Sequence, residues 1–179
     1  LFAFMLAGLQ NNVAIILILC FIGLYAIYSA PPIRFKRFGF LNNTLIGLES
    51  ALMFAAGFAS QNPNIKLIPV NAFLAIFIIF AVAGNIKDLK DYEQDKKQGI
   101  PTLGAILGKK NAARLLAVLT SFCFPLSIAM FGFWSLLLAS VIFAAVNAAL
   151  LLKFETEKTV FACYFLFLTL IIAYLLGFL

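Results

Sequence analysis

Several residue types that support chemistry in soluble enzymes are scarce or missing in this 179-residue chain. It has no histidine and only seven acidic residues. The commonest general base and metal ligand of proteins is therefore excluded. Cys20, Cys123 and Cys163 lie far apart inside apolar segments. This spacing excludes a paired redox or zinc motif and indicates small buried side chains.

Charge of either sign is also rare. Only 11% of the residues are charged, 64% are hydrophobic, and the mean hydropathy is +1.08. Soluble domains are about a quarter charged and about half apolar, so the composition indicates an integral membrane protein that lies in the lipid bilayer. The net charge of +6 does not indicate nucleic acid as a partner, because the basic residues occupy short loops and not a long basic face.

Apolar runs of about 20 residues, the length that crosses a bilayer as a helix, divide the chain. The alternation of polar and apolar residues that marks a membrane barrel is missing. We therefore predict an all-α, polytopic transmembrane helical bundle with six full spans, after an N-terminal stub at 1–9. The expected spans are 13–29, 41–60, 67–84, 112–130, 134–152 and 160–179.

Alternate loops differ sharply in charge. The loops around residues 30–40, 86–114 and 153–158 hold 12 of the 13 basic residues, and the opposite loops hold only Lys66. Basic loops of membrane proteins stay in the cytoplasm. We therefore expect the three charged loops, and the acidic residues among them, to face the cytoplasm.

Acidic residues gather in one of these loops, where positions 88–95 hold four of the seven. If 85–98 is one helix, Asp88, Asp91 and Asp95 share a face and span about 10 Å. Carboxylates on one face repel each other unless cations neutralise them, and Mg²⁺ prefers oxygen ligands shared with a substrate phosphate. The spacing predicts a magnesium site.

The same segment also fits a solvated helix whose lysines neutralise its aspartates. Lys87 stands four residues before Asp91, which is the spacing of a stabilising ion pair on a helix. Lys90 and Lys96 are further candidate partners. The residues alone leave both interpretations open.

A second polar segment follows the first full span. Pro31 and Pro32 stop the helix, and Arg34, Lys36 and Arg37 come directly after them. Arginine and lysine bind phosphate oxygens well. Simple anchoring at the cytoplasmic surface would also explain these cations. With the aspartates expected on the same face, we favour a bound substrate phosphate.

Glu49 lies near the middle of the span expected at 41–60. A carboxyl group inside a membrane is a candidate functional group by default. A neutral, hydrogen-bonded packing residue would explain Glu49 equally well.

Together these segments resemble the UbiA superfamily of intramembrane prenyltransferases. Residues 85–108 are similar to its second Asp-rich motif, and residues 28–36 to the loop between its fourth and fifth helices. The resemblance implies the last part of a nine-helix fold. We therefore expect a single domain over 1–179 that is N-terminally incomplete and lacks the family's first Asp-rich motif.

The resemblance further implies transfer of a prenyl group from an isoprenyl diphosphate to an acceptor, usually aromatic, with Mg²⁺ as cofactor. Asp88, Asp91 and Asp95 would supply one metal-binding set, with Asn85 and Glu49 as further candidates. Lys36, Arg34 and Tyr28 would bind the diphosphate.

Two alternatives stay open. One is prenyl transfer to a glycerol phosphate or sugar phosphate. The other is a noncatalytic transporter or cation-binding scaffold, which Glu49 and the missing first motif favour.

Overall fold

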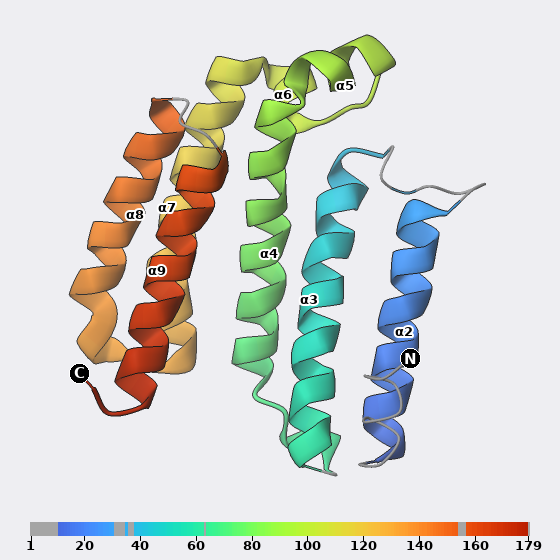
Figure 1. Cartoon of the computed structure of the whole chain (residues 1–179), viewed down its shortest axis with the longest axis vertical. Helices are drawn as coiled ribbons and strands as arrows, with labels where there is room; N and C mark the ends of the chain where they lie inside the picture. The colour runs from blue at the N-terminus through green and yellow to red at the C-terminus, as the bar shows by residue number, and fades with distance from the viewer. Residues whose placement is uncertain (1–10, 31–34, 36–37, 63, 154–156, 179) are drawn as a thin grey trace. The chain divides into compact units, whose positions relative to one another are not determined.

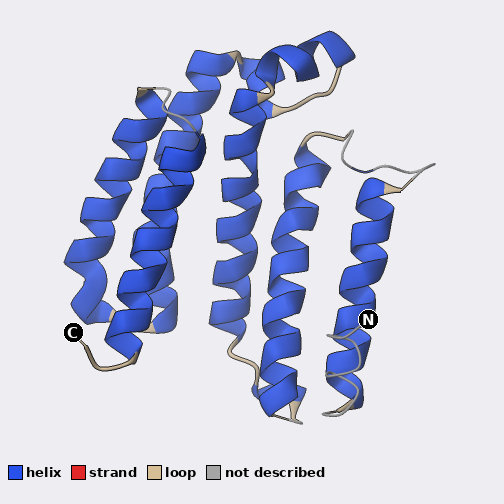
Figure 2. Ribbon diagram, viewed as in Figure 1, coloured by secondary structure: helices blue, strands red, loops and turns tan. Residues whose placement is uncertain are grey.

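A computed structural model describes residues 11–30, 35, 38–62, 64–153 and 157–178. Within these residues the chain is helical and has no β-strand (Figure 1, Figure 2), which confirms the all-α prediction. The stub expected at 1–9 lies outside the described residues. The long helices are α2 (Asn12–Ser29), α3 (Phe40–Gln61), α4 (Val70–Lys90), α7 (Lys109–Phe131), α8 (Leu137–Leu152) and α9 (Glu157–Leu175). The short ones are the 3₁₀ helices η2 (Ile65–Leu67) and η3 (Trp134–Leu136) and the α-helices α5 (Tyr92–Gln98) and α6 (Leu103–Leu107).

Five of the described segments are long and apolar enough to cross a membrane. They are α2, α4, α7, α9 and the stretch Trp134–Leu152 that joins η3 to α8. The sixth expected span corresponds to α3, which is a helix of 22 residues but is not among these five. It contains two asparagines and Glu49, polar groups that can bond to neighbouring helices within a membrane.

The chain divides into two compact units, Leu1–Gly84 and Asn85–Leu179. The first unit contains α2, α3, η2 and most of α4. The second contains the end of α4 and the later helices. The single domain expected over 1–179 stays a prediction.

In the first unit, small residues line one face of α3. Positions 43, 47, 51, 55 and 59 are all buried, and four of them are glycine or alanine. A Cβ added to Gly47 would lie 2.5 Å from the backbone oxygen of Phe77 in α4. One added to Gly84 of α4 would lie 2.6 Å from Asn43 Oδ1. Helices in lipid associate through such close packing, because burial of apolar surface gives little gain there.

Asn11 holds the start of α2 in the same unit. Its side-chain oxygen accepts a hydrogen bond from Ala14 N at 2.9 Å, which satisfies one of the unpaired amides at a helix start. Its amide nitrogen donates to the carbonyl oxygen of Ala59, near the end of α3. One side chain therefore caps α2 and joins it to α3.

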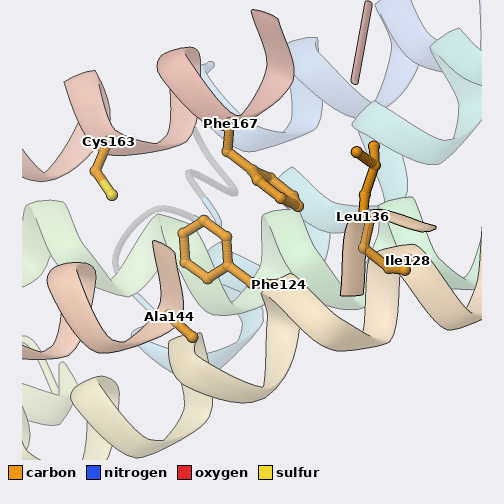
Figure 3. Close-up of a cluster of buried hydrophobic side chains, with 6 residues drawn as sticks. All are labelled: Phe124, Ile128, Leu136, Ala144, Cys163 and Phe167. Atoms are coloured by element: carbon orange, nitrogen blue, oxygen red, sulfur yellow. The ribbon is translucent and has the colours of Figure 1, made fainter. Parts of the chain in front are cut away.

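The second unit is built around α7, which packs along α8, while α8 also contacts α9. Phe124 is at the centre of the buried cluster between these helices (Figure 3). Its ring stacks on Tyr164 with centroids 4.9 Å apart and meets Phe167 edge-on at 5.0 Å. A buried hydrogen bond also joins α7 to α8: the Thr120 hydroxyl donates to Asn147 Oδ1 at 3.0 Å.

We expect Gly47→Ala to destabilise the protein, because its Cβ would collide with the backbone of α4. Overpacking of this kind costs about 1–3 kcal/mol, which corresponds to several degrees in the midpoint of thermal unfolding in detergent. Gly57→Ala on the same helix is the matched control, since a Cβ there meets nothing within 4 Å. Equal midpoints for the two variants would contradict the close contact.

Candidate metal centre

Asp88 lies in the last turn of α4 and is only 8% exposed. Ile86 and Leu89, on either side of it in sequence, are buried as well. Asn85, the further candidate from sequence, is half-buried one turn earlier on the same helix. A carboxyl so little exposed at the end of an apolar helix costs free energy unless it is bonded or neutralised.

The condition that residues 85–98 form one helix is not met, because the helix is interrupted at Asp91. α4 ends at Lys90 and α5 begins at Tyr92, and Asp91 between them has φ −86° and ψ 6°. The hydrogen bond from Asp91 N to Lys87 O is stretched to 3.4 Å, while Asp95 N bonds Asp91 O at 2.9 Å. Because ψ departs from its helical value of about −42°, α5 leaves the axis of α4 (Figure 1). Ideal helical spacing therefore does not fix where the third aspartate lies.

The composition of α5 explains why a helix of seven residues forms after the break. Glu93 and Asp95 lie in its first turn, and Lys96 and Lys97 in its last. Each sign of charge is thus at the helix end whose dipole favours it. Gly99 ends the helix with φ 68°, a left-handed conformation that glycine adopts without steric cost.

The Asp95 carboxyl has a perturbed electrostatic environment. Its partial burial raises the pKa above the usual value, a hydrogen bond from Thr102 opposes this rise, and the Asp91 carboxylate adds to it. Asp91 and Asp95 therefore lie close enough to repel each other. A bound cation would offset both the desolvation cost of the charged carboxylates and their mutual repulsion.

A short turn returns the chain from α5 to α6. Ile100 N donates to Asp95 O, and Thr102 N donates to Ile100 O, both at 2.9 Å. Thr102 then caps α6 by accepting a hydrogen bond from Ala105 N at 3.3 Å. α6 in turn packs against α7, so the turn connects the aspartates to the helices of the second unit.

The lysines near the aspartates have other partners. Lys90 Nζ lies 2.8 Å from Glu157 Oε1 in the first turn of α9, and Lys96 Nζ lies 5.9 Å from the centre of the Tyr92 ring. Lys90 also interacts electrostatically with Asp91, so the interpretation of a helix neutralised by its own lysines stays open. The Lys90–Glu157 pair also places the start of α9 beside the end of α4, as expected for loops on one face.

The donor set fits magnesium in its chemistry. Its three carboxylates are oxygen donors, and Mg²⁺ is held in proteins by one or two carboxylates together with water and substrate phosphate. The repulsion from Asp91 that helps to raise the pKa of Asp95 favours a cation at these carboxylates. Among the described residues, no group of three or more histidine, cysteine or acidic side chains is placed so that it could hold a metal ion.

The other candidates are placed less completely. Arg34 and Lys36 lie outside the described residues. Tyr28 is half-buried in the last turn of α2, where its ring stacks on Tyr25 with centroids 6.3 Å apart. Glu49 is half-buried in α3, and its Oε1 has no hydrogen-bond partner within the described part of the chain. These observations leave the roles of all four as predictions.

Sequence reasoning missed two features of this region. The break at Asp91 has no proline or glycine to announce it, and Glu157 is too distant in sequence to be recognised as a partner of Lys90. The position of Thr102 at the start of α6 had a weak indication in the sequence. Threonine is a favoured residue at a helix start, and it precedes an apolar stretch at 103–107.

The family model described as "UbiA prenyltransferase family" matches residues 1–171. The chain is 31% identical over 134 residues to the homogentisate phytyltransferase of a Synechocystis species, and 31% identical over 135 residues to the digeranylgeranylglyceryl phosphate synthase of Methanocaldococcus jannaschii. The match covers 70% of this chain in both cases, but only 42% and 46% of the two relatives. No solved structure matches the chain.

We expect Asp95→Asn to raise the thermal midpoint in metal-free buffer at neutral pH by about 2 °C. The amide removes a charge that burial and Asp91 disfavour, and it keeps an oxygen that can accept the Thr102 hydrogen bond. Glu93→Gln, which removes one charge from an exposed position in the first turn of the same helix, is the control and should leave the midpoint equal or slightly lower, because the helix dipole favours that charge. A lower midpoint for Asp95→Asn would show that the charge is already compensated.

Proposed function

Because the chain belongs to the UbiA prenyltransferase family, we propose that it transfers a prenyl group from an isoprenyl diphosphate to an acceptor within the membrane. The observation that carries the proposal is the family match over residues 1–171. The aspartate cluster at the end of an apolar helix supports it, because a diphosphate is bound in water while its prenyl tail requires lipid or apolar protein.

In this proposal Asp88, Asp91 and Asp95 hold Mg²⁺ through their carboxylate oxygens. The bound metal would neutralise charge on the departing diphosphate. Lys36 and Arg34 would bind diphosphate oxygens directly, the arginine through its forked guanidinium. Tyr28 would act as a neutral hydrogen-bond donor to the same group.

The reaction needs few protein groups beyond these. The bond between the allylic carbon and the diphosphate oxygen breaks, and the electron pair leaves with the diphosphate. The allylic cation that remains is attacked by an electron-rich atom of the acceptor, which then loses a proton. Apolar helices would exclude water, which would otherwise capture the cation.

The acceptor class is open between two candidates. One relative is named for homogentisate and the other for a glyceryl phosphate. We propose an aromatic acceptor for this chain, with a glycerol phosphate as the competing choice. Incubating the purified protein with an isoprenyl diphosphate and either acceptor, followed by mass spectrometry of the products, would distinguish them.

The double variant Asp88→Ala/Asp91→Ala tests the metal site. We expect prenyl transfer to fall at least about a hundredfold, the size of effect seen when a preorganised electrostatic stabiliser is lost. The exposed Glu93, in the same segment, provides the control variant Glu93→Ala, which should stay within about twofold. Retained activity in the double variant would overturn the assignment of these aspartates.

For the basic loop we expect Lys36→Ala to raise the KM for the isoprenyl diphosphate about tenfold. A hydrogen bond to a charged group contributes about 1.5–3 kcal/mol, and the lower end of this range corresponds to about a tenfold change. The KM for the acceptor should not change. Lys66→Ala, on the loop of the opposite expected face, is the control. Steady-state kinetics in detergent or nanodiscs would measure both constants, and equal diphosphate KM values for the two variants would exclude Lys36 from the site.

A further inference from the structure

Two hydrogen-bonding groups are buried in the second unit without a partner. One is the side-chain nitrogen of Asn147 in α8, and the other is the hydroxyl of Tyr164 in α9. Neither makes a hydrogen bond within the described part of the chain, and Asn147 as a whole is 0% exposed. A buried polar group costs free energy unless something bonds to it, and the interior of a bilayer offers no bulk water that could do so.

The contacts between α7 and α8 place Asn147 along the two helices. The Thr120 hydroxyl donates to Asn147 Oδ1 at 3.0 Å. One turn further along α7, the ring of Phe124 stacks on that of Phe143 with centroids 6.4 Å apart. Four residues forward on α7 are thus matched by four residues back on α8, as in any antiparallel pair. Asn147 therefore lies one turn nearer the start of α7 than the Phe124–Phe143 pair.

α9 reaches the same two helices at the level of these phenylalanines. The ring of Tyr164 stacks on Phe124 with centroids 4.9 Å apart. The neighbouring Cys163 donates from Sγ to the carbonyl oxygen of Phe143 at 3.7 Å. The backbone of α9 at Tyr164 is therefore about one helical turn away from the level of Asn147.

The Tyr164 side chain bridges this turn. Phe133, just after α7, meets Tyr174 near the end of α9 with ring centroids 5.8 Å apart, so α7 and α9 run in the same direction (Figure 1). A long side chain on a helix leans toward the start of that helix. The Tyr164 hydroxyl therefore extends toward Thr120 and Asn147.

Apolar side chains surround the place where these polar groups meet. Leu116 and Phe124 lie one turn before and one turn after Thr120 on α7, and they are 0% and 1% exposed. Val160, one turn before Tyr164 on α9, is 1% exposed. None of these side chains can donate or accept a hydrogen bond. The missing partner therefore has to be small, polar and enclosed by the three helices.

We propose that Asn147, Tyr164 and Thr120 bind one buried water molecule that joins α7, α8 and α9. The water accepts hydrogen bonds from Asn147 Nδ2 and from the Tyr164 hydroxyl. It donates to Thr120 Oγ1, whose own proton is used in the bond to Asn147 Oδ1 but whose oxygen can still accept. Three hydrogen bonds are the usual number for a buried water. The site uses none of the residues that the proposed function assigns to the reaction.

A plain polar contact between helices would make different predictions. If Asn147 served only to bond Thr120, the Tyr164 hydroxyl would contribute nothing that depends on Asn147. Tyr164→Phe removes the hydroxyl alone, and Asn147→Leu removes the amide while keeping a similar volume. Tyr174→Phe is the matched control, because Tyr174 lies on the same helix, packs against Phe133, and has no buried hydroxyl without a partner.

The first measurement is the thermal midpoint of the purified full chain in detergent. We expect Tyr164→Phe to lower it by about 2–4 °C, the effect of losing one hydrogen bond in a chain of this size. The same substitution made in the Asn147→Leu background should leave the midpoint unchanged, because the water site is already lost there. Tyr174→Phe should match the wild type. Equal falls in the two backgrounds would overturn the inference.

The second measurement distinguishes a shared water from a direct bond between the two side chains. Infrared difference spectra of the wild type minus Tyr164→Phe, recorded in ordinary and in oxygen-18 water, should contain a water stretching band that moves with the oxygen isotope. Side-chain hydroxyl and amide bands do not move in this way. Asn147→Leu should give the same difference band, and Tyr174→Phe should give none. Loss of thermal stability in Tyr164→Phe without an isotope-sensitive band would mean a direct bond and would overturn the water site.

Discussion

The cost of removing a carboxylate from water governs how this chain is arranged around its aspartates. An apolar helix such as α4 occupies the membrane, so its charged end has to lie where water begins. Asp88 is nevertheless almost buried there, and Asp95 has a raised pKa for the same reason. The backbone of α6 approaches the last turn of α4 here, since a Cβ added to Gly104 would lie 3.4 Å from the Asp88 carbonyl oxygen. Such partial desolvation makes a carboxylate a stronger cation ligand, because water competes less for it.

α6 is in turn held in place by α7. α6 ends at Gly108, whose φ of 77° lets α7 begin immediately, and α6 packs on α7. α7 is then held by the Phe124 cluster and by the Thr120–Asn147 hydrogen bond. The second unit therefore connects the buried Phe124 cluster to α6 through α7.

Apolar run length predicted most helices well, because a span has to match the bilayer. The run at 13–29 became α2 (Asn12–Ser29), and the run at 112–130 became α7 (Lys109–Phe131). The aspartates were also found from sequence, since acid is so rare in this chain. The break at Asp91 was not, because residues 85–98 contain no helix breaker and local preference favours one continuous helix. Tertiary contacts of α6, formed by residues more than ten positions later, outweigh that preference.

A broken helix also suits the proposed chemistry better than a continuous one. Seven residues of straight helix would separate Asp88 from Asp95 by about 10 Å along the axis, whereas the ligands of one magnesium ion lie only about 2 Å from it. In the broken arrangement, the direction of α5 and not the helical rise decides the separation. The contacts of α6 then become the means by which the sequence sets that separation.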